Sequence, residues 1–201
     1  MGTGFCAALT GGIACGKSAV AAVWKSLGAE VLDADDVVHG LIGPDGACTE
    51  AVAKAFGPDM RAPGGGIDRA RLGRRIFADP EARKRLEALL HPEVIRRTRA
   101  WAEDIRRSGR QGAAVVPLLF EAGMARDWDA VVCVASDVKT ILKRLAERGL
   151  SPDEARQRIA SQWPVGAKCA QAGHVIENNG SLAELEEKSR ALWTHLTKQG
   201  D

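Results

Sequence analysis

The residues from Gly11 to Ser18 have the types and the spacing of a phosphate-binding loop. They read GGIACGKS and fit the Walker A pattern GxxxxGK[ST]. The apolar run Phe5–Leu9 before them is typical of a buried strand, and the residues after them have a helical pattern up to Leu27. In such a setting backbone N–H groups hold phosphate oxygens, Lys17 reaches the β- and γ-phosphates, and the Ser18 hydroxyl binds Mg²⁺. The loop predicts a bound nucleoside triphosphate, and a glycine-rich turn without a phosphate role is the alternative.

Two aspartates follow the second predicted strand. Asp33 and Asp35 come directly after the short apolar segment Ala29–Leu32. In open α/β sheets ligands bind at the carboxyl ends of the strands, where the phosphate loop also lies. A carboxylate there can accept the proton of an attacking hydroxyl group, or it can cap the next helix. We expect one aspartate to cap the helix or hold water at Mg²⁺ and the other to face the substrate.

Two arginines and two further polar residues are weaker candidates. Arg144 and Arg148 lie four residues apart on one predicted helix face, before a charged segment whose composition is typical of a mobile lid. Arginines near a lid can neutralise charge on a transferred phosphoryl group, and a solvated helix face with ion pairs is the alternative. A lone histidine such as His91 more often caps a helix or packs in a core than binds a metal. Asn178 lies either in a simple turn or beside a purine ring.

The elements that would position these residues alternate as in a βαβ protein. The predicted strands are Phe5–Leu9, Ala29–Leu32, Ala113–Leu119, Ala130–Ala135 and His174–Glu177. The helices predicted in the second half are Val138–Arg148, Ser151–Gln162 and Ser181–Leu196, the last with Ser181 as N-cap. This order predicts an α/β fold with a parallel sheet.

The middle of the chain, from about residue 37 to residue 109, has no clear strand. Its helical segments are Arg69–Phe77, Pro80–Leu90 and Pro92–Ile105, with both prolines suited to first-turn positions. Twelve basic and six acidic residues lie between positions 69 and 107. A solvated helical face and a surface for an anionic substrate explain this excess about equally well. RNA binding is a weaker alternative, since only two aromatic side chains accompany the basic ones.

Composition restricts the class of protein. The 201 residues are 45% hydrophobic and 27% charged, with a net charge of +2, which is ordinary for a globular domain and too small to indicate nucleic-acid binding. No apolar run approaches the roughly 20 residues that cross a bilayer, and no leader pattern precedes the phosphate loop. The five cysteines are scattered without CxxC spacing, which argues against a disulfide framework or a zinc site. We expect a cytoplasmic protein that binds neither membrane nor nucleic acid.

Several segments together resemble the dephospho-coenzyme A kinase family. They are the loop Thr10–Ser18, the Asp33-Ala34-Asp35 triplet, His91-Pro92, Pro117–Glu121, Arg144 with Arg148, Arg158-Ile159 with Gln162, and Asn178 with Gly180. They span nearly the whole chain in the family's order, which makes the set far more specific than the loop alone.

The resemblance implies transfer of a phosphoryl group from ATP to the ribose 3′-hydroxyl of dephospho-coenzyme A, the last step of coenzyme A synthesis. It implies Asp35, Lys17 and Arg144 as catalytic residues, and Ser18 as a ligand of Mg²⁺. The implied ATP site consists of Gly11, Gly12, Ile13, Ala14, Cys15, Gly16, Lys17, Ser18, Ala19, Arg148 and Asn178. The implied acceptor site consists of Thr10, Asp33, Asp35, His91, Pro117, Leu118 and Leu119.

The family's fold is a three-layer P-loop kinase with a lid. On this chain the resemblance implies a core of residues 1–36, 111–148 and 170–201, a helical substrate subdomain at 37–110 and a lid at 149–169, in a monomer or a weak homo-oligomer. Ala14, Cys15 and Ala19 depart from the family's usual Gly, Ser and Thr. A requirement for positive φ at Ala14 would cost energy, and Ala19 removes a hydroxyl near the α-phosphate.

Two other functions fit the loop. One is another small-molecule P-loop kinase, acting on a nucleoside monophosphate, shikimate or gluconate. The other is a non-catalytic protein gated by ATP. Replacing Asp35 separates the second from an enzyme, because only an enzyme would lose turnover while it keeps ATP binding.

Overall fold

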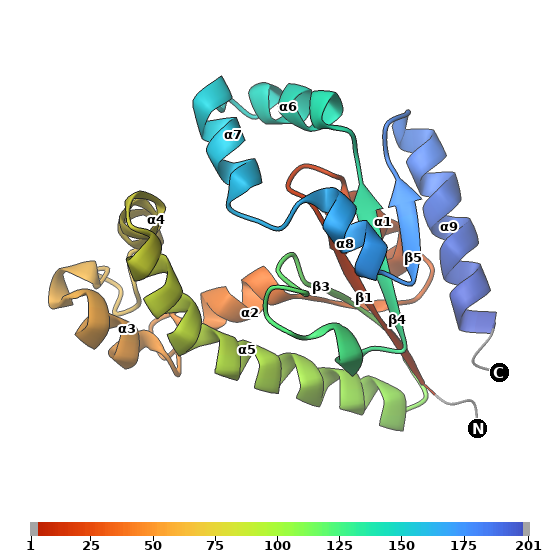
Figure 1. The fold of residues 1–201 in the computed structure, drawn as a ribbon. Coiled ribbons are helices and arrows are strands. Elements are labelled where there is room, and N and C mark those ends of the chain that lie inside the picture. The colour runs from red at the N-terminus through yellow and green to blue at the C-terminus, as the bar shows by residue number, and fades with distance from the viewer. Residues whose placement is uncertain (1–3, 199–201) are drawn as a thin grey trace. The chain divides into compact units, whose positions relative to one another are not determined.

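The computed structural model describes residues 4–198 and contains a five-stranded parallel sheet with helices on both faces (Figure 1). The strands are β1 (Phe5–Gly11), β2 (Glu30–Asp33), β3 (Gln111–Val115), β4 (Ala130–Ala135) and β5 (His174–Glu177), in the spatial order β2-β3-β1-β4-β5. All four pairings are parallel. The predicted α/β class with a parallel sheet is confirmed.

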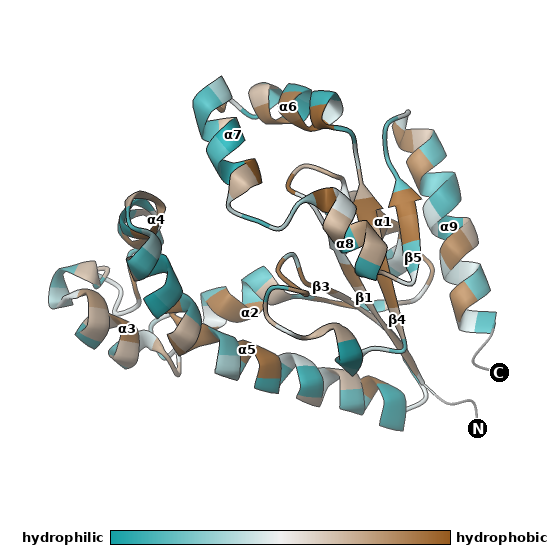
Figure 2. Cartoon of the chain, in the orientation of Figure 1, coloured by the Kyte–Doolittle hydropathy of each residue, from teal (hydrophilic) through white to brown (hydrophobic). Residues whose placement is uncertain are grey.

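Alternation along the strands divides the sheet's side chains between two cores. On one face, Leu9 and Val134 pack with residues of α1 (Lys17–Ser26) and α9 (Leu182–Lys198). Trp24 of α1 and Trp193 of α9 lie 4.8 Å apart between ring centroids in this core. On the other face, α8 (Val165–Gln171) packs against β4 and β1. The central strands are brown along their length in Figure 2, as expected for strands that are covered on both faces.

The β3 strand ends earlier than predicted. It stops at Val115, whereas the apolar run continued to Leu119. The N–H of Val116 still donates to the Leu9 carbonyl at 2.9 Å, but Pro117 has no N–H and cannot extend the ladder. The residues after Val116 therefore form the loop that follows β3.

Residues 34–100 form a separate compact unit. It contains α2 (Ala34–Leu41), α3 (Thr49–Phe56), the short 3₁₀ helix η1 (Pro58–Met60), α4 (Arg69–Ala78) and the first part of α5 (Pro80–Arg107). The prediction of two helices divided before Pro92 is wrong, because α5 continues through this proline. Pro92 removes one backbone donor, and the flanking turns keep the helix intact with Leu90 and Val94 buried.

The segment between β4 and β5 holds three helices. They are α6 (Val138–Glu147), α7 (Pro152–Ala160) and α8, which the sequence pattern did not predict. Ser151 and Glu154 form a capping box at the start of α7, and Ser181 and Glu184 exchange the corresponding bonds before α9, at 3.1 and 3.2 Å. The 3₁₀ helix η2 (Ala125–Asp127) precedes β4. In the described part of the chain, no helix combines the length and the apolar character that a membrane span needs.

Candidate active site

The phosphate loop joins the end of β1 to the start of α1 and adopts left-handed backbone at three positions. The φ angles are 140° at Gly11, 56° at Ala14 and 103° at Gly16. A Cβ on Gly11 would clash with the Val134 carbonyl, and one on Gly16 would clash with the Asn178 amide. Glycine is therefore required at both positions, by the close approach of neighbouring atoms as well as by φ. At Ala14 the Cβ makes the positive φ strained.

Lys17 and Ser18 open α1 at this loop. The Lys17 ammonium donates to the carbonyls of Gly11 at 3.1 Å and Gly12 at 2.8 Å. Ser18 is exposed, and its hydroxyl has no hydrogen-bond partner within residues 4–198. The first turn of a helix leaves backbone N–H groups unpaired, so these two side chains stand where an anion would bind.

Arg144 and Asn178 hold the loop from outside. Arg144 donates to the carbonyl of Ala14 and the hydroxyl of Ser136, at 3.1 and 3.0 Å, and to the backbone and side-chain oxygens of Asn178, both at 3.1 Å. The buried Asn178 amide donates to the Cys15 carbonyl at 2.8 Å. The network joins the phosphate loop to the segments after β4 and β5. Sequence reasoning missed Ser136, which had no motif signal.

A second network lies at the ends of β1 and β3. The Pro117 carbonyl accepts from the Thr10 hydroxyl at 3.3 Å and from the Lys168 ammonium at 2.7 Å. Lys168 is completely buried and forms an ion pair of 2.8 Å with Glu121. Lys168 was not a predicted site residue, and Glu121 was noted only as the end of the Pro117–Glu121 motif. Of the expected acceptor residues here, Leu119 is completely buried, while Pro117 and Leu118 are half-buried.

The two aspartates lie on either side of the boundary between the compact units. Asp33 ends β2 and is half-buried at the sheet edge where β1 also ends. Asp35 is exposed in the first turn of α2, within residues 34–100. His91 also belongs to that unit and is half-buried inside α5. Arg148 is exposed after α6, with no side-chain partner in the described part of the chain.

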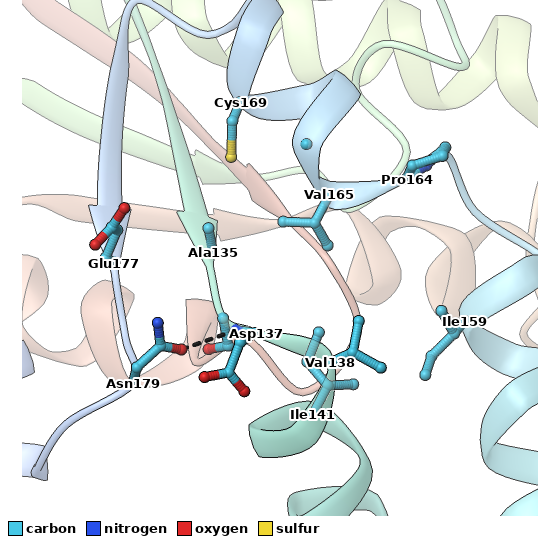
Figure 3. Close-up of a pocket in the computed structure, with 12 residues that line it drawn as sticks. Ala135, Asp137, Val138, Ile141, Ile159, Pro164, Val165, Cys169, Glu177 and Asn179 are labelled. Atoms are coloured by element: carbon cyan, nitrogen blue, oxygen red, sulfur yellow. Dashed lines mark hydrogen bonds between the residues drawn. The ribbon is translucent and has the colours of Figure 1, made fainter.

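A cavity of about 490 Å³ lies at the carboxyl ends of β4 and β5. Figure 3 shows apolar side chains around it, with the Asn179 side chain accepting from the backbone N–H of Asp137 at 2.8 Å. Its lining includes Ala135, Val138, Ile141, Ile159, Val165 and Cys169. Val165 also contacts the phosphate loop, because a Cβ on Gly12 would clash with it. The cavity therefore adjoins the loop and suits a mostly apolar group.

The cysteines of this region are packing residues. Cys15 is completely buried, and this burial raises the pKa of its thiol. The Sγ atoms of Cys133 in β4 and Cys169 in α8 lie 3.6 Å apart, and burial likewise raises the pKa of Cys133. Within residues 4–198 no three His, Cys, Asp or Glu side chains gather as metal ligands.

Ion pairs neutralise part of the basic excess of the middle segment. Glu93 accepts from Arg96 at 2.5 Å and from Arg97 at 3.0 Å, and these bonds lower the pKa of Glu93 to about 2. Arg71 pairs with Asp59 at 3.3 Å. The solvated-face interpretation thus accounts for several arginines, while Arg75 and Arg85 are exposed without such partners among the described residues.

The strain at Ala14 gives a testable prediction. We expect Ala14→Val to lower the free energy of unfolding by about 2–3 kcal/mol, because a β-branched residue at positive φ is strongly disfavoured and the site is buried. Ala14→Gly should stay within about 1 kcal/mol of wild type, since relief of strain and loss of a buried methyl group oppose each other. Chemical unfolding measures both. Ala19→Val, at a helical position of α1, is the control, and equal losses for the two valine variants would refute the strain.

Comparisons with known proteins agree with this geometry. Residues 5–184 match the family model described as dephospho-CoA kinase. The dephospho-CoA kinase of Symbiobacterium thermophilum is 44% identical over 189 residues, which cover 92% of this chain and 78% of that protein. That of Geobacter metallireducens is 43% identical, with 92% and 93% covered. The solved dephospho-CoA kinase of Campylobacter jejuni superimposes with a TM-score of 0.75 at 26% identity, covering 98% of both chains. The chain belongs to the dephospho-CoA kinase family.

Proposed function

We propose that the protein transfers the γ-phosphoryl group of ATP to the ribose 3′-hydroxyl of dephospho-coenzyme A, giving coenzyme A and ADP. The observation that carries the proposal is the phosphate loop with Lys17 and Ser18, placed at the same sheet edge as Asp33 and the Pro117–Glu121 segment. Segments that the family resemblance assigns to the triphosphate and to the acceptor therefore lie at one edge of one sheet, which supports the proposal. Membership of a phosphotransferase family supports the same reaction.

Lys17 would neutralise the charge of the β- and γ-phosphates. Its ammonium is already at the loop, on the Gly11 and Gly12 carbonyls, and a bound triphosphate would offer it stronger, charged acceptors. The left-handed turns at Ala14 and Gly16 shape the loop around the phosphates. Arg144 would keep that shape through the Ala14 carbonyl, while the exposed Arg148 would approach the phosphates from the lid side.

The residues present fit a magnesium ion brought in by ATP. The exposed Ser18 hydroxyl supplies an oxygen donor, which is the ligand type that Mg²⁺ prefers, and phosphates and water would complete the set. The ion, when bound, neutralises charge on the phosphate oxygens.

Asp35 would accept the proton of the attacking 3′-hydroxyl. Its position in the sequence, two residues after the end of β2, supports this role. The acceptor would be held by Thr10, Asp33, His91 and the Pro117–Leu119 segment, with residues 37–110 as the coenzyme-binding subdomain. The exposed Arg74, Arg75 and Arg85 supply positive charge there for the phosphates of the coenzyme.

The adenine of ATP would lie at the apolar cavity next to the loop. Its walls are mostly apolar, and Asp137 and Asn179 offer polar groups at its rim (Figure 3). Asn178 would act near the base indirectly, by donating to the Cys15 carbonyl, because both the oxygen and the nitrogen of its amide already bond within the protein. We also propose that the protein is cytoplasmic and works as a monomer or a weak homo-oligomer.

A coupled assay of ADP release tests the proposal. Dephospho-coenzyme A, adenosine, AMP and shikimate are offered in turn with ATP and Mg²⁺. We expect turnover with dephospho-coenzyme A only, and product bearing phosphate on the ribose 3′-oxygen. Release with AMP or shikimate alone would instead support another small-molecule kinase, and ATP binding without any ADP release would support a gated binding protein.

A further inference from the structure

We propose that Lys168 is a positioning residue that fixes the loop after β3 to the returning part of the lid. The inference rests on the proposed function, because that loop is the expected acceptor site. It concerns the Pro117–Glu121 loop and the segment Trp163–Lys168, which both lie in the unit that contains the sheet.

The contacts of Lys168 are unusual for a lysine. Its side chain is completely buried, and its ammonium has two oxygen partners, the Pro117 carbonyl at 2.7 Å and Glu121 Oε1 at 2.8 Å. Burying an ammonium group is costly unless such partners compensate the charge. Lys168 therefore remains buried only while the loop after β3 keeps both oxygens in place.

The same loop is fastened to the lid side by two further contacts. The backbone N–H of Trp163 donates to Glu121 Oε1 at 3.0 Å. The rings of Phe120 and Trp163 stack with a centroid distance of 6.3 Å and an interplanar angle of 13°. Glu121 thus bonds to both ends of the segment Trp163–Lys168, through one carboxylate oxygen.

The Pro117 carbonyl carries this restraint to the phosphate loop. Besides Lys168 it accepts from Thr10, the residue that precedes Gly11. A displaced Pro117 would move expected acceptor contacts relative to the phosphate loop. Transfer between two substrates depends steeply on their relative position, so Lys168 would act on the reaction without touching either substrate.

The charged pair also makes the arrangement depend on both partners. An apolar pair could pack in many registers, whereas the ammonium is satisfied only when Pro117 and Glu121 are both within bonding distance. Glu121 Oε2 is buried without a partner among the described residues. Oε1 therefore makes both of the contacts that join Glu121 to the segment Trp163–Lys168. Loss of either charge should therefore free the loop and the lid segment together.

Steady-state kinetics of Lys168→Met and Glu121→Gln test the inference. We expect the KM for dephospho-coenzyme A to rise between about 10- and 100-fold in both variants, with the KM for ATP within about twofold of wild type. Lys168→Arg, which keeps the charge and hydrogen-bond donors, should recover part of the loss. Lys188→Met is the matched control, because Lys188 also donates to a carbonyl at a strand end, that of Glu177 at 3.1 Å.

Hydrogen exchange supplies a readout that needs no acceptor. In either variant the amides of residues 116, 118–121, 163 and 165–168 should lose protection together, while those of residues 11–18 keep theirs. Equal rises in both KM values, or unchanged exchange in folded Lys168→Met and Glu121→Gln, would overturn the inference. A wild-type protein without turnover on dephospho-coenzyme A would overturn the proposed function instead, and the exchange result would still decide whether the two segments are linked.

Discussion

The Asp35→Asn variant is expected to turn over dephospho-coenzyme A about 100- to 1,000-fold more slowly than wild type, with ATP affinity within about twofold. An amide has nearly the size of the carboxylate but cannot take the proton of the attacking hydroxyl. The loss lies at the lower end of the range for general bases, because phosphoryl transfer depends mostly on positioning and charge stabilisation. ADP release gives kcat, and titration with a fluorescent ATP analogue gives the affinity.

Asp36→Asn is the matched control. Asp36 is the next residue in the same first turn of α2, is also exposed, and lies 3.7 Å from His39 Nδ1. Its replacement removes the same charge from the same helix end, so a through-space effect on the site would be shared by both variants. Turnover of Asp35→Asn within threefold of wild type would contradict the assignment of Asp35 as the base. Matching losses in the two variants would assign the effect to the charge of the helix terminus.

Much of the sheet could be predicted because its signal is local. β4 and β5 begin and end at the predicted residues, since β4 is an apolar run and β5 has the β-branched pair Val175-Ile176 before a turn. The phosphate loop was equally visible, because its glycines and Lys17 must occupy fixed positions in the sequence. The sequence showed that a positive φ would be costly at Ala14 without showing that one occurs, and the structure has φ at 56° there.

The missing parts depend on contacts between distant residues. Arg144 meets the Ala14 carbonyl 130 positions away, and Lys168 meets Pro117 across 51 positions. No periodic or spaced pattern in the sequence indicates either of these two contacts. Arg144 was a candidate from its spacing to Arg148 and from the family motif, but the sequence could not show that its guanidinium donates to the loop and to Asn178. Lys168 looked like one more charged residue of the lid, since burial of a lysine requires partners that the sequence does not identify.

The same limit explains the error at Pro92. Proline is common at the first position of a helix and rare inside one, so a break before it was the better expectation. The structure has α5 continuous instead, with Leu90 and Val94 buried on either side of the proline. Burial of the flanking apolar residues outweighs the loss of one hydrogen bond, and this balance is set by tertiary packing.

The Lys17→Met variant is expected to lower kcat/KM for ATP about 100- to 1,000-fold. Met has a similar length but no charge and no donor, so the variant loses the neutralisation of the transferred phosphoryl group. The ligand-free protein would also lose the bonds to the Gly11 and Gly12 carbonyls, which we expect to cost about 1 kcal/mol of unfolding free energy. Steady-state kinetics and chemical unfolding measure the two effects separately.

Two companion variants decide what the lysine supplies. Lys25→Met removes an exposed charge from the last turn of the same helix and should leave kcat/KM within about twofold of wild type. Lys17→Arg keeps the charge but replaces a compact ammonium by a longer, planar fork, which cannot reproduce the ammonium's contacts with the Gly11 and Gly12 carbonyls. We therefore expect Lys17→Arg to remain impaired. Full activity of Lys17→Arg would show that charge alone suffices, and full activity of Lys17→Met would remove Lys17 from the mechanism.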